Sequence, residues 1–113
     1  MAELEIENYA LLINTDSEFS FRIETGFWVT TGADQPFFTP AAGDWSAGMP
    51  QRLPGAISAA LVDDAKTLRI DFTSGEQICV PADLHYEAWT LTGPRGYLVV
   101  SMPGGELAIW SAR

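Results

Sequence analysis

Apolar and polar residues alternate in several short runs along this chain, as they do in half-buried β-strands. The clearest runs are residues 3–7, 19–24 and 68–73, in which every second residue is apolar. The spacing that is typical of amphipathic helices is scarce in the rest of the chain. The pattern therefore predicts an all-β domain.

Turn signals follow two of these runs and predict β-hairpins. Thr25-Gly26 leads into the apolar segment 27–31, and Ser74-Gly75 leads into the segment 76–80, which Pro81 ends. A proline cannot donate a hydrogen bond to the next strand, so it is a natural end for a strand. We expect one hairpin of this kind in each half of the chain.

The two halves also resemble each other in detail. One constant shift in numbering places segment 8–38 on segment 57–87 and superposes, for example, Leu12 on Leu61. An internal duplication and the geometry that all β-hairpins share both explain this similarity. Since a three-stranded unit cannot bury its apolar face alone, we predict a single domain over residues 1–113. It is a compact sandwich or a curved antiparallel sheet made of two related hairpin-containing halves.

Between the halves lies a long segment, residues 32–55, that has no strand period and contains four prolines. Long loops in small domains often carry function. This one also contains the bulky apolar residues Phe37, Phe38, Trp45 and Met49. Such side chains either fold back over the core or contact a partner.

The last third of the chain predicts a three-stranded meander. Its strands are residues 86–91, 96–101 and 106–110, and its turns are the glycine- and proline-containing segments 92–95 and 103–105.

Composition narrows the classes of function. Of the 113 residues, 47% are hydrophobic, which excludes a disordered chain, and the net charge is −9. A nucleic acid or an anionic membrane surface would repel so acidic a protein. The only cysteine is Cys79 and the first residues are acidic rather than basic, so we expect a cytoplasmic protein without disulfides or a secretory signal.

Few residues offer chemistry. His85 is the only histidine, and Cys79 stands in an apolar strand pattern that favours a buried, inert thiol. One histidine and one cysteine are too few ligands for zinc, and Asp63-Asp64 lacks the spacing of a calcium loop. We therefore predict neither a cofactor nor an enzyme.

Two C-terminal segments have distinctive sequences, YEAWTLTGP at residues 86–94 and PGGELAIW at residues 103–110. They resemble the patterns Y-E-A-W-x-L-x-G-P and P-G-G-x-L-A-x-W of a family of small acidic bacterial domains that is common in actinobacteria. The resemblance covers about residues 57–110 and is less specific in the N-terminal half. It implies an association with toxin-immunity loci, and thus a protein that blocks a cognate toxin by stoichiometric binding.

An acidic surface rich in aromatic residues also suits a protein-binding module, because aromatic side chains anchor interfaces and negative potential attracts a basic partner. We predict a non-catalytic domain that binds a basic protein, with toxin neutralisation as the role that the resemblance implies. The candidate partner-binding residues are Asp34, Phe37, Phe38, Asp44, Trp45, Asp63, Asp64, Asp83 and Glu87.

Two other functions stay open. A small-ligand-binding or enzymatic β-domain would have a pocket lined by Trp28, Trp45 and Trp89. A self-associating module would form a homodimer through an exposed sheet edge. Glu87 has alternatives of its own, because it either pairs across the sheet with Arg95 or Arg69 or faces a cation of the partner.

Overall fold

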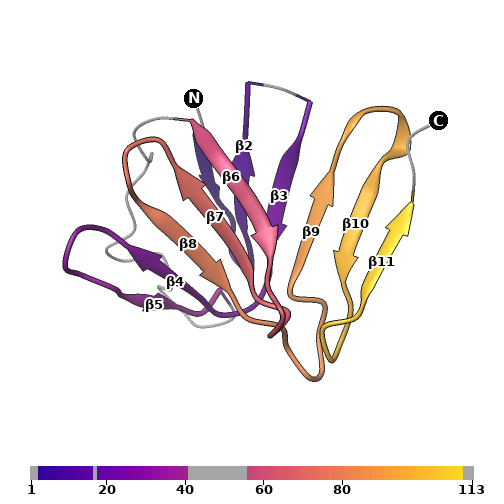
Figure 1. The fold of residues 1–113 in the computed structure, drawn as a ribbon. Helices are drawn as coiled ribbons and strands as arrows, with labels where there is room; N and C mark the ends of the chain where they lie inside the picture. The colour runs from indigo at the N-terminus through magenta and orange to yellow at the C-terminus, as the bar shows by residue number, and fades with distance from the viewer. Residues whose placement is uncertain (1–2, 17, 41–55, 111–113) are drawn as a thin grey trace.

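A computed structural model describes residues 3–16, 18–40 and 56–110. Over these residues the chain forms eleven short strands in two antiparallel sheets (Figure 1). The one helical segment among them is η1, the three-residue turn Pro94–Gly96, so no described helix is long enough to cross a membrane. The all-β prediction is confirmed.

The first sheet, sheet A, has six strands in the order β1-β2-β3-β9-β10-β11. It joins an N-terminal meander to a C-terminal meander through the pairing of β3 with β9. The predicted C-terminal meander is confirmed, with its turns between β9 and β10 and between β10 and β11. The strands are β1 (Glu3–Ile6), β2 (Leu11–Asn14), β3 (Ser20–Ile23), β9 (Trp89–Thr92), β10 (Leu98–Ser101) and β11 (Leu107–Trp110).

The second sheet, sheet B, has five strands in the order β5-β4-β8-β7-β6. Its strands are β4 (Phe27–Thr30), β5 (Phe37–Phe38), β6 (Ile57–Val62), β7 (Leu68–Phe72) and β8 (Gln77–Val80). The hairpin predicted at Ser74-Gly75 is confirmed, since β7 pairs with β8 and the Gly75 N–H donates to the carbonyl of Phe72. Gly75 has φ +94°, a conformation that a residue with a side chain rarely adopts.

The hairpin predicted at Thr25-Gly26 is wrong. Strand β3 pairs with β2 and β9, whereas β4 pairs with β5 and β8 in the other sheet. Residues 24–26 thus carry the chain from sheet A to sheet B, and residues 81–88 carry it back between β8 and β9. The crossing lets the apolar side chains of β3 and β4 enter one core from opposite sides, which a single hairpin cannot do.

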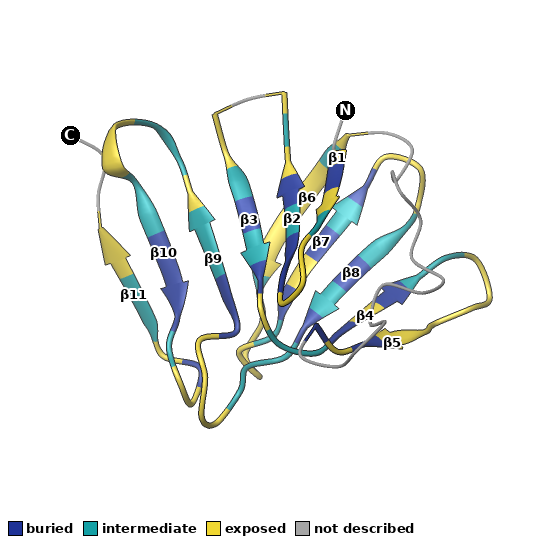
Figure 2. Cartoon of the chain, turned by 180° about the vertical axis from the view of Figure 1, so that it is seen from behind, coloured by how far each residue is buried: buried dark blue, intermediate teal, exposed yellow. Residues whose placement is uncertain are grey.

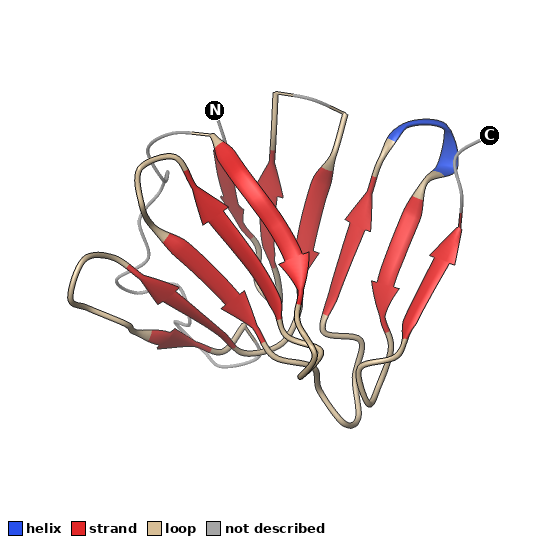
Figure 3. Ribbon diagram, viewed as in Figure 1, coloured by secondary structure: helices blue, strands red, loops and turns tan. Residues whose placement is uncertain are grey.

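The strands form two sheets (Figure 3), and the core lies between them, where every second residue of most strands is buried (Figure 2). Sheet A contributes side chains such as Ile13, Ile23 and Trp89, and sheet B contributes side chains such as Phe27 and Ile70. The two sheets and this shared core form an all-β sandwich, as predicted.

The two segments of the suggested repeat pair differently. In residues 8–38, strands β2 and β3 belong to sheet A and β4 to sheet B, whereas in residues 57–87 strands β6, β7 and β8 all belong to sheet B. An ancient duplication stays a prediction. Of the long segment 32–55, residues up to 40 are described and contain β5, and residues 41–55 lie outside the described part.

Candidate binding cleft

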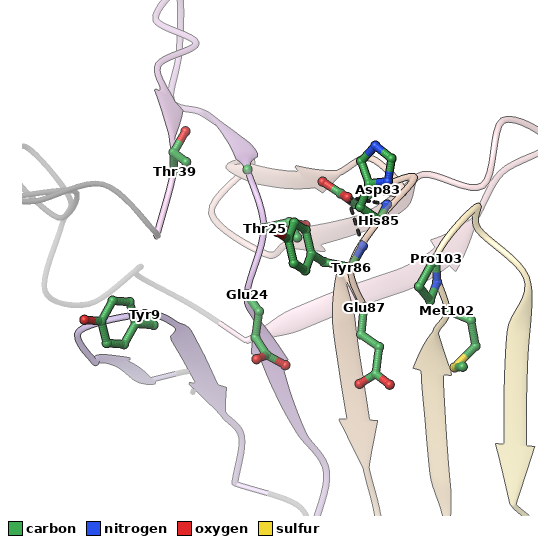
Figure 4. A pocket seen from close by; sticks show the side chains of 11 residues that line it. Tyr9, Glu24, Thr25, Thr39, Asp83, His85, Tyr86, Glu87, Met102 and Pro103 are labelled. Atoms are coloured by element: carbon green, nitrogen blue, oxygen red, sulfur yellow. Dashed lines mark hydrogen bonds between the residues drawn. The ribbon is translucent and has the colours of Figure 1, made fainter.

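A cleft of about 730 Å³ lies beside the two places where the chain crosses between the sheets (Figure 4). The first crossing, residues 24–26, lines the cleft, and so do Asp83 and residues 85–87 of the second crossing. Further lining residues come from the β1–β2 turn, from the end of β5 and from the β10–β11 turn. The full lining is Tyr9, Glu24, Thr25, Gly26, Thr39, Asp83, His85, Tyr86, Glu87, Met102 and Pro103.

Asp83 organises one wall of the cleft. Its carboxylate Oδ1 accepts the backbone N–H of His85 at 2.8 Å and that of Tyr86 at 3.0 Å, an arrangement that stabilises a tight turn. Its carbonyl accepts the N–H of Gly104 at 2.7 Å, which ties the β10–β11 turn to the same wall. The side chains of His85 and Tyr86 are exposed as a result.

Glu24 and Glu87 both line the cleft. The Glu24 N–H donates to the carbonyl of Ala88 at 3.0 Å, which extends the pairing of β3 with β9 and brings the two glutamates to adjacent strand ends. In Figure 4 both carboxylates extend in the same direction. The Glu24 carboxylate is 3.9 Å from Arg22 Nε, but Arg22 makes its short ion pair, 2.8 Å, with Glu7.

Glu87 makes no ion pair with a described residue. The predicted pairing with Arg69 or Arg95 is not found, since Arg69 lies in sheet B, 3.8 Å from Asp71. Among the lining residues three are acidic, and none is a lysine or an arginine. Negative charge that gathers in a hollow attracts cations more strongly than the same charge on a flat surface.

Aromatic and polar groups complete the cleft. Tyr9 is 71% exposed and Tyr86 is 68% exposed, so both rings offer open faces to a ligand. The hydroxyl oxygen of Thr25 is buried and has no hydrogen-bond partner among the described residues. The cleft therefore combines carboxylates and aromatic rings, a set that suits a cationic group.

Two of the predicted partner-binding residues, Asp83 and Glu87, lie in this cleft. Asp34 and Phe37 are exposed at the β4–β5 end of sheet B. Asp63 and Asp64 are in the β6–β7 turn, where Asp63 Oδ1 accepts the N–H groups of Ala65 and Thr67. The predicted residues thus occupy separate places, and Asp44 and Trp45 lie outside the described residues.

Phe38 requires a correction. It is 7% exposed, and its ring stacks on that of Phe27 with centroids 5.7 Å apart. The alternation along β5 turns Phe38 into the core and leaves Phe37 outside, so Phe38 is not available to a partner.

The predicted tryptophan-lined pocket is also corrected. Trp89 is 2% exposed and faces the core, whereas Trp28 is 42% exposed on the outer face of sheet B. The two side chains point to different regions and cannot line one pocket. Trp45 lies outside the described residues.

Most of the cleft could not be predicted from the sequence. Tyr9, Glu24, Thr25 and Met102 come from distant segments that only the two crossings bring together. Thr25-Gly26 did stand out as a turn, but nothing in its sequence distinguishes a hairpin from a crossing between sheets.

No group of three His, Cys, Asp or Glu side chains in the described residues is placed to hold a metal ion. Cys79 is in β8, where burial raises the pKa of its thiol, with a further contribution from Asp71, against a lowering by Arg69. Its thiol donates to Gln77 Oε1 at 3.1 Å.

A family model matches residues 5–111, nearly the whole chain. The chain belongs to the DUF6188 family. DUF6188 is a family of unknown function, and its match extends over the N-terminal half, beyond the segment in which the C-terminal motifs were noted. The comparisons with curated proteins and with solved structures found no match to this DUF6188 chain.

Proposed function

We propose that this DUF6188 domain is a non-catalytic module that binds a basic protein, and that the cleft receives a lysine or arginine side chain of that partner. The observation that carries the proposal is that two carboxylates, those of Glu24 and Glu87, line one cleft together with two exposed tyrosine residues. Glu87 has no described ion-pair partner, so a cation from outside would pair with it directly.

The chemistry of the cleft favours a long basic side chain. Its aliphatic stem would lie along Tyr86 and Met102, and its charged end would reach the carboxylates. A charge-assisted hydrogen bond is stronger than a neutral one, and a cation over a tyrosine face adds further attraction. The net charge of −9 would increase the rate of association with a basic protein.

A toxin is the partner class that we propose, following the resemblance to domains associated with toxin-immunity loci. A stoichiometric inhibitor needs a surface that binds the toxin and no catalytic group of its own. The proposed role therefore requires only that the cleft be complementary to the toxin in shape and charge.

Capture from a lysate of the native organism tests the proposal. The tagged full chain is incubated at low salt and eluted at high salt, in parallel with the variant E24Q/E87Q and with the control E3Q/E5Q. The control removes the same two charges from β1, outside the cleft. Glutamine keeps the size of glutamate, so the packing of both variants should be unchanged.

We expect one basic protein in equal stoichiometry with the wild type and with E3Q/E5Q, and at least tenfold less of it with E24Q/E87Q. Equal capture by all three proteins would show that the cleft is not the binding site. Recovery of no basic protein at low salt would contradict the function itself.

A second candidate is a site for a small cationic metabolite. The volume of the cleft lies in the range of small-ligand sites, and its carboxylates and exposed tyrosines suit a small cation as well as a basic side chain. Native mass spectrometry of the eluate distinguishes the two functions, because a bound small molecule adds a few hundred daltons and a protein partner adds its whole chain.

A further inference from the structure

A row of side chains crosses the whole outer face of sheet B. Strand register places one residue from each strand in this row, in the order Phe37, Trp28, Cys79, Arg69 and Leu61. Their neighbours along the strands, such as Phe38, Val29 and Ile70, point into the core. We call these five residues the outer row.

The outer row is more apolar than an outer face usually is. Trp28 is 42% exposed, Phe37 46% and Leu61 41%, and the rings of Trp28 and Phe37 contact each other with centroids 4.6 Å apart. Exposed apolar residues that form a continuous patch, unlike scattered ones, indicate an interaction surface. The exposed aromatic pair forms one end of the row, and the exposed aliphatic Leu61 forms the other.

The charge of this face argues for a second copy of the chain as the partner. The charged side chains on the outward positions of the sheet B strands are Arg69 and Asp71, which lie 3.8 Å apart and cancel. Elsewhere the surface is acidic, as on β1, where Glu3 and Glu5 point outward. Two copies of a chain with net charge −9 repel each other over most of their surface, and this face avoids that repulsion.

We propose that two copies associate through this face, with the two-fold axis parallel to the strands and passing at Cys79. This arrangement places Trp28 against Arg69 of the second copy and Phe37 against Leu61 of the second copy. The two Cys79 residues then face each other across the axis. The outer row is thus complementary to itself, as an isologous interface requires.

Charge favours this axis over a perpendicular one through the same outer row. A two-fold axis perpendicular to the strands and passing along the outer row would place Arg69 against Arg69 of the second copy, and the like charges would repel. With the parallel axis each guanidinium lies over an indole ring, where a cation is attracted. The proposed dimer does not involve the cleft, so it is independent of the proposed function.

Two measurements on the full chain test the proposal. Sedimentation equilibrium gives the association constant, and a short bis-maleimide reports whether the two Cys79 thiols are close. Facing sheets lie about 10 Å apart, so the two sulfurs should be within reach of the reagent. Each thiol adds across one maleimide double bond, forming a carbon–sulfur bond, and its proton ends on the adjacent ring carbon.

We expect a concentration-dependent dimer that the reagent converts to a covalent dimer. W28T and, independently, L61K should each lower the association constant at least tenfold and abolish the cross-link. The matched control is W110T, since Trp110 is 52% exposed and lies in sheet A. W110T should have the association constant and the cross-link of the wild type. Thermal melts verify that all three variants are folded.

A chain that stays monomeric and gives no covalent dimer at millimolar concentration would overturn the proposal. A dimer that persists in both W28T and L61K would also overturn it, and would point to pairing along a sheet edge instead. Because Trp28 does not line the cleft, W28T should keep the capture of a basic partner, and this separates failure of the dimer from failure of the proposed function.

Discussion

The hydroxyl of Ser101 is fully buried, and no described residue hydrogen-bonds its oxygen. Ser101 is the only polar residue among the buried side chains of the described core. A hydroxyl that loses water without gaining a partner destabilises the folded state. The Ser101 hydroxyl therefore lowers the stability of the folded domain.

We therefore expect S101A to stabilise the domain by about 1 kcal/mol, because alanine keeps most of the volume and removes the unpaired hydroxyl. Urea unfolding measures the change. The control is S20A, since Ser20 Oγ shares a 2.8 Å hydrogen bond with Thr92 Oγ1 across β3 and β9. S20A should destabilise the domain by about 0.5–1 kcal/mol. A loss of stability in S101A would show that the hydroxyl has a partner in solution.

At the scale of elements, the first crossing depends on a close contact of Gly26. A β-carbon at this position would overlap the Phe37 ring and lie 2.8 Å from its Cε2 atom. Gly26 has no left-handed backbone conformation, so the requirement for glycine is steric. The glycine lets the edge strand β5 fold back over the start of β4.

We expect G26A to destabilise the domain by about 1–2 kcal/mol, because the Phe37 ring must move and lose its contact with Trp28. A double-mutant cycle with F37A isolates this cause. In the F37A background the cost of G26A should fall to a few tenths of a kcal/mol, measured by urea unfolding. An equal cost in both backgrounds would assign the requirement for glycine to the backbone instead.

Elements were predictable where a signal is local. Alternation identified the strands around 19–24 and 68–73, and the Ser74-Gly75 turn and the C-terminal meander formed as expected. The crossing at Thr25-Gly26 was not predictable, because the same two residues serve a hairpin or a passage between sheets. Whether β3 pairs with β4 or with β9 is decided by which partner completes the core, and that depends on the whole chain.

At the scale of the whole molecule, pairing between distant strands explains why only part of the candidate site could be predicted. Asp83 was chosen as an acidic residue of a loop and Glu87 as an acidic residue of a predicted strand, and both line the cleft. Glu24 was interpreted as the outward position of a strand, and Tyr9 was not singled out. The pairing of β3 with β9, a contact between residues more than sixty positions apart, brings Glu24 to the same cleft as Glu87, and Tyr9 reaches it from the β1–β2 turn.

The net charge of −9 acts on the whole molecule as well. Carboxylates held close together in the folded state repel each other more than in the unfolded chain, and salt screens this repulsion. Raising NaCl from about 0.02 to 0.5 M, where the Debye length falls to a few ångströms, should therefore raise the unfolding temperature by several degrees. The increase should be smaller in E3Q/E5Q, which carries two charges fewer.

The same salt should weaken capture of a basic partner, so ionic strength acts on folding and on binding with opposite signs. Thermal melts and capture experiments, carried out over the same series of salt concentrations, measure both effects. If binding falls while the unfolding temperature rises, the loss of binding comes from screened attraction between the partners. If the unfolding temperature falls with salt, the folded state is held by attraction between charges, and the short ion pair between Arg22 and Glu7 becomes the first candidate for that role.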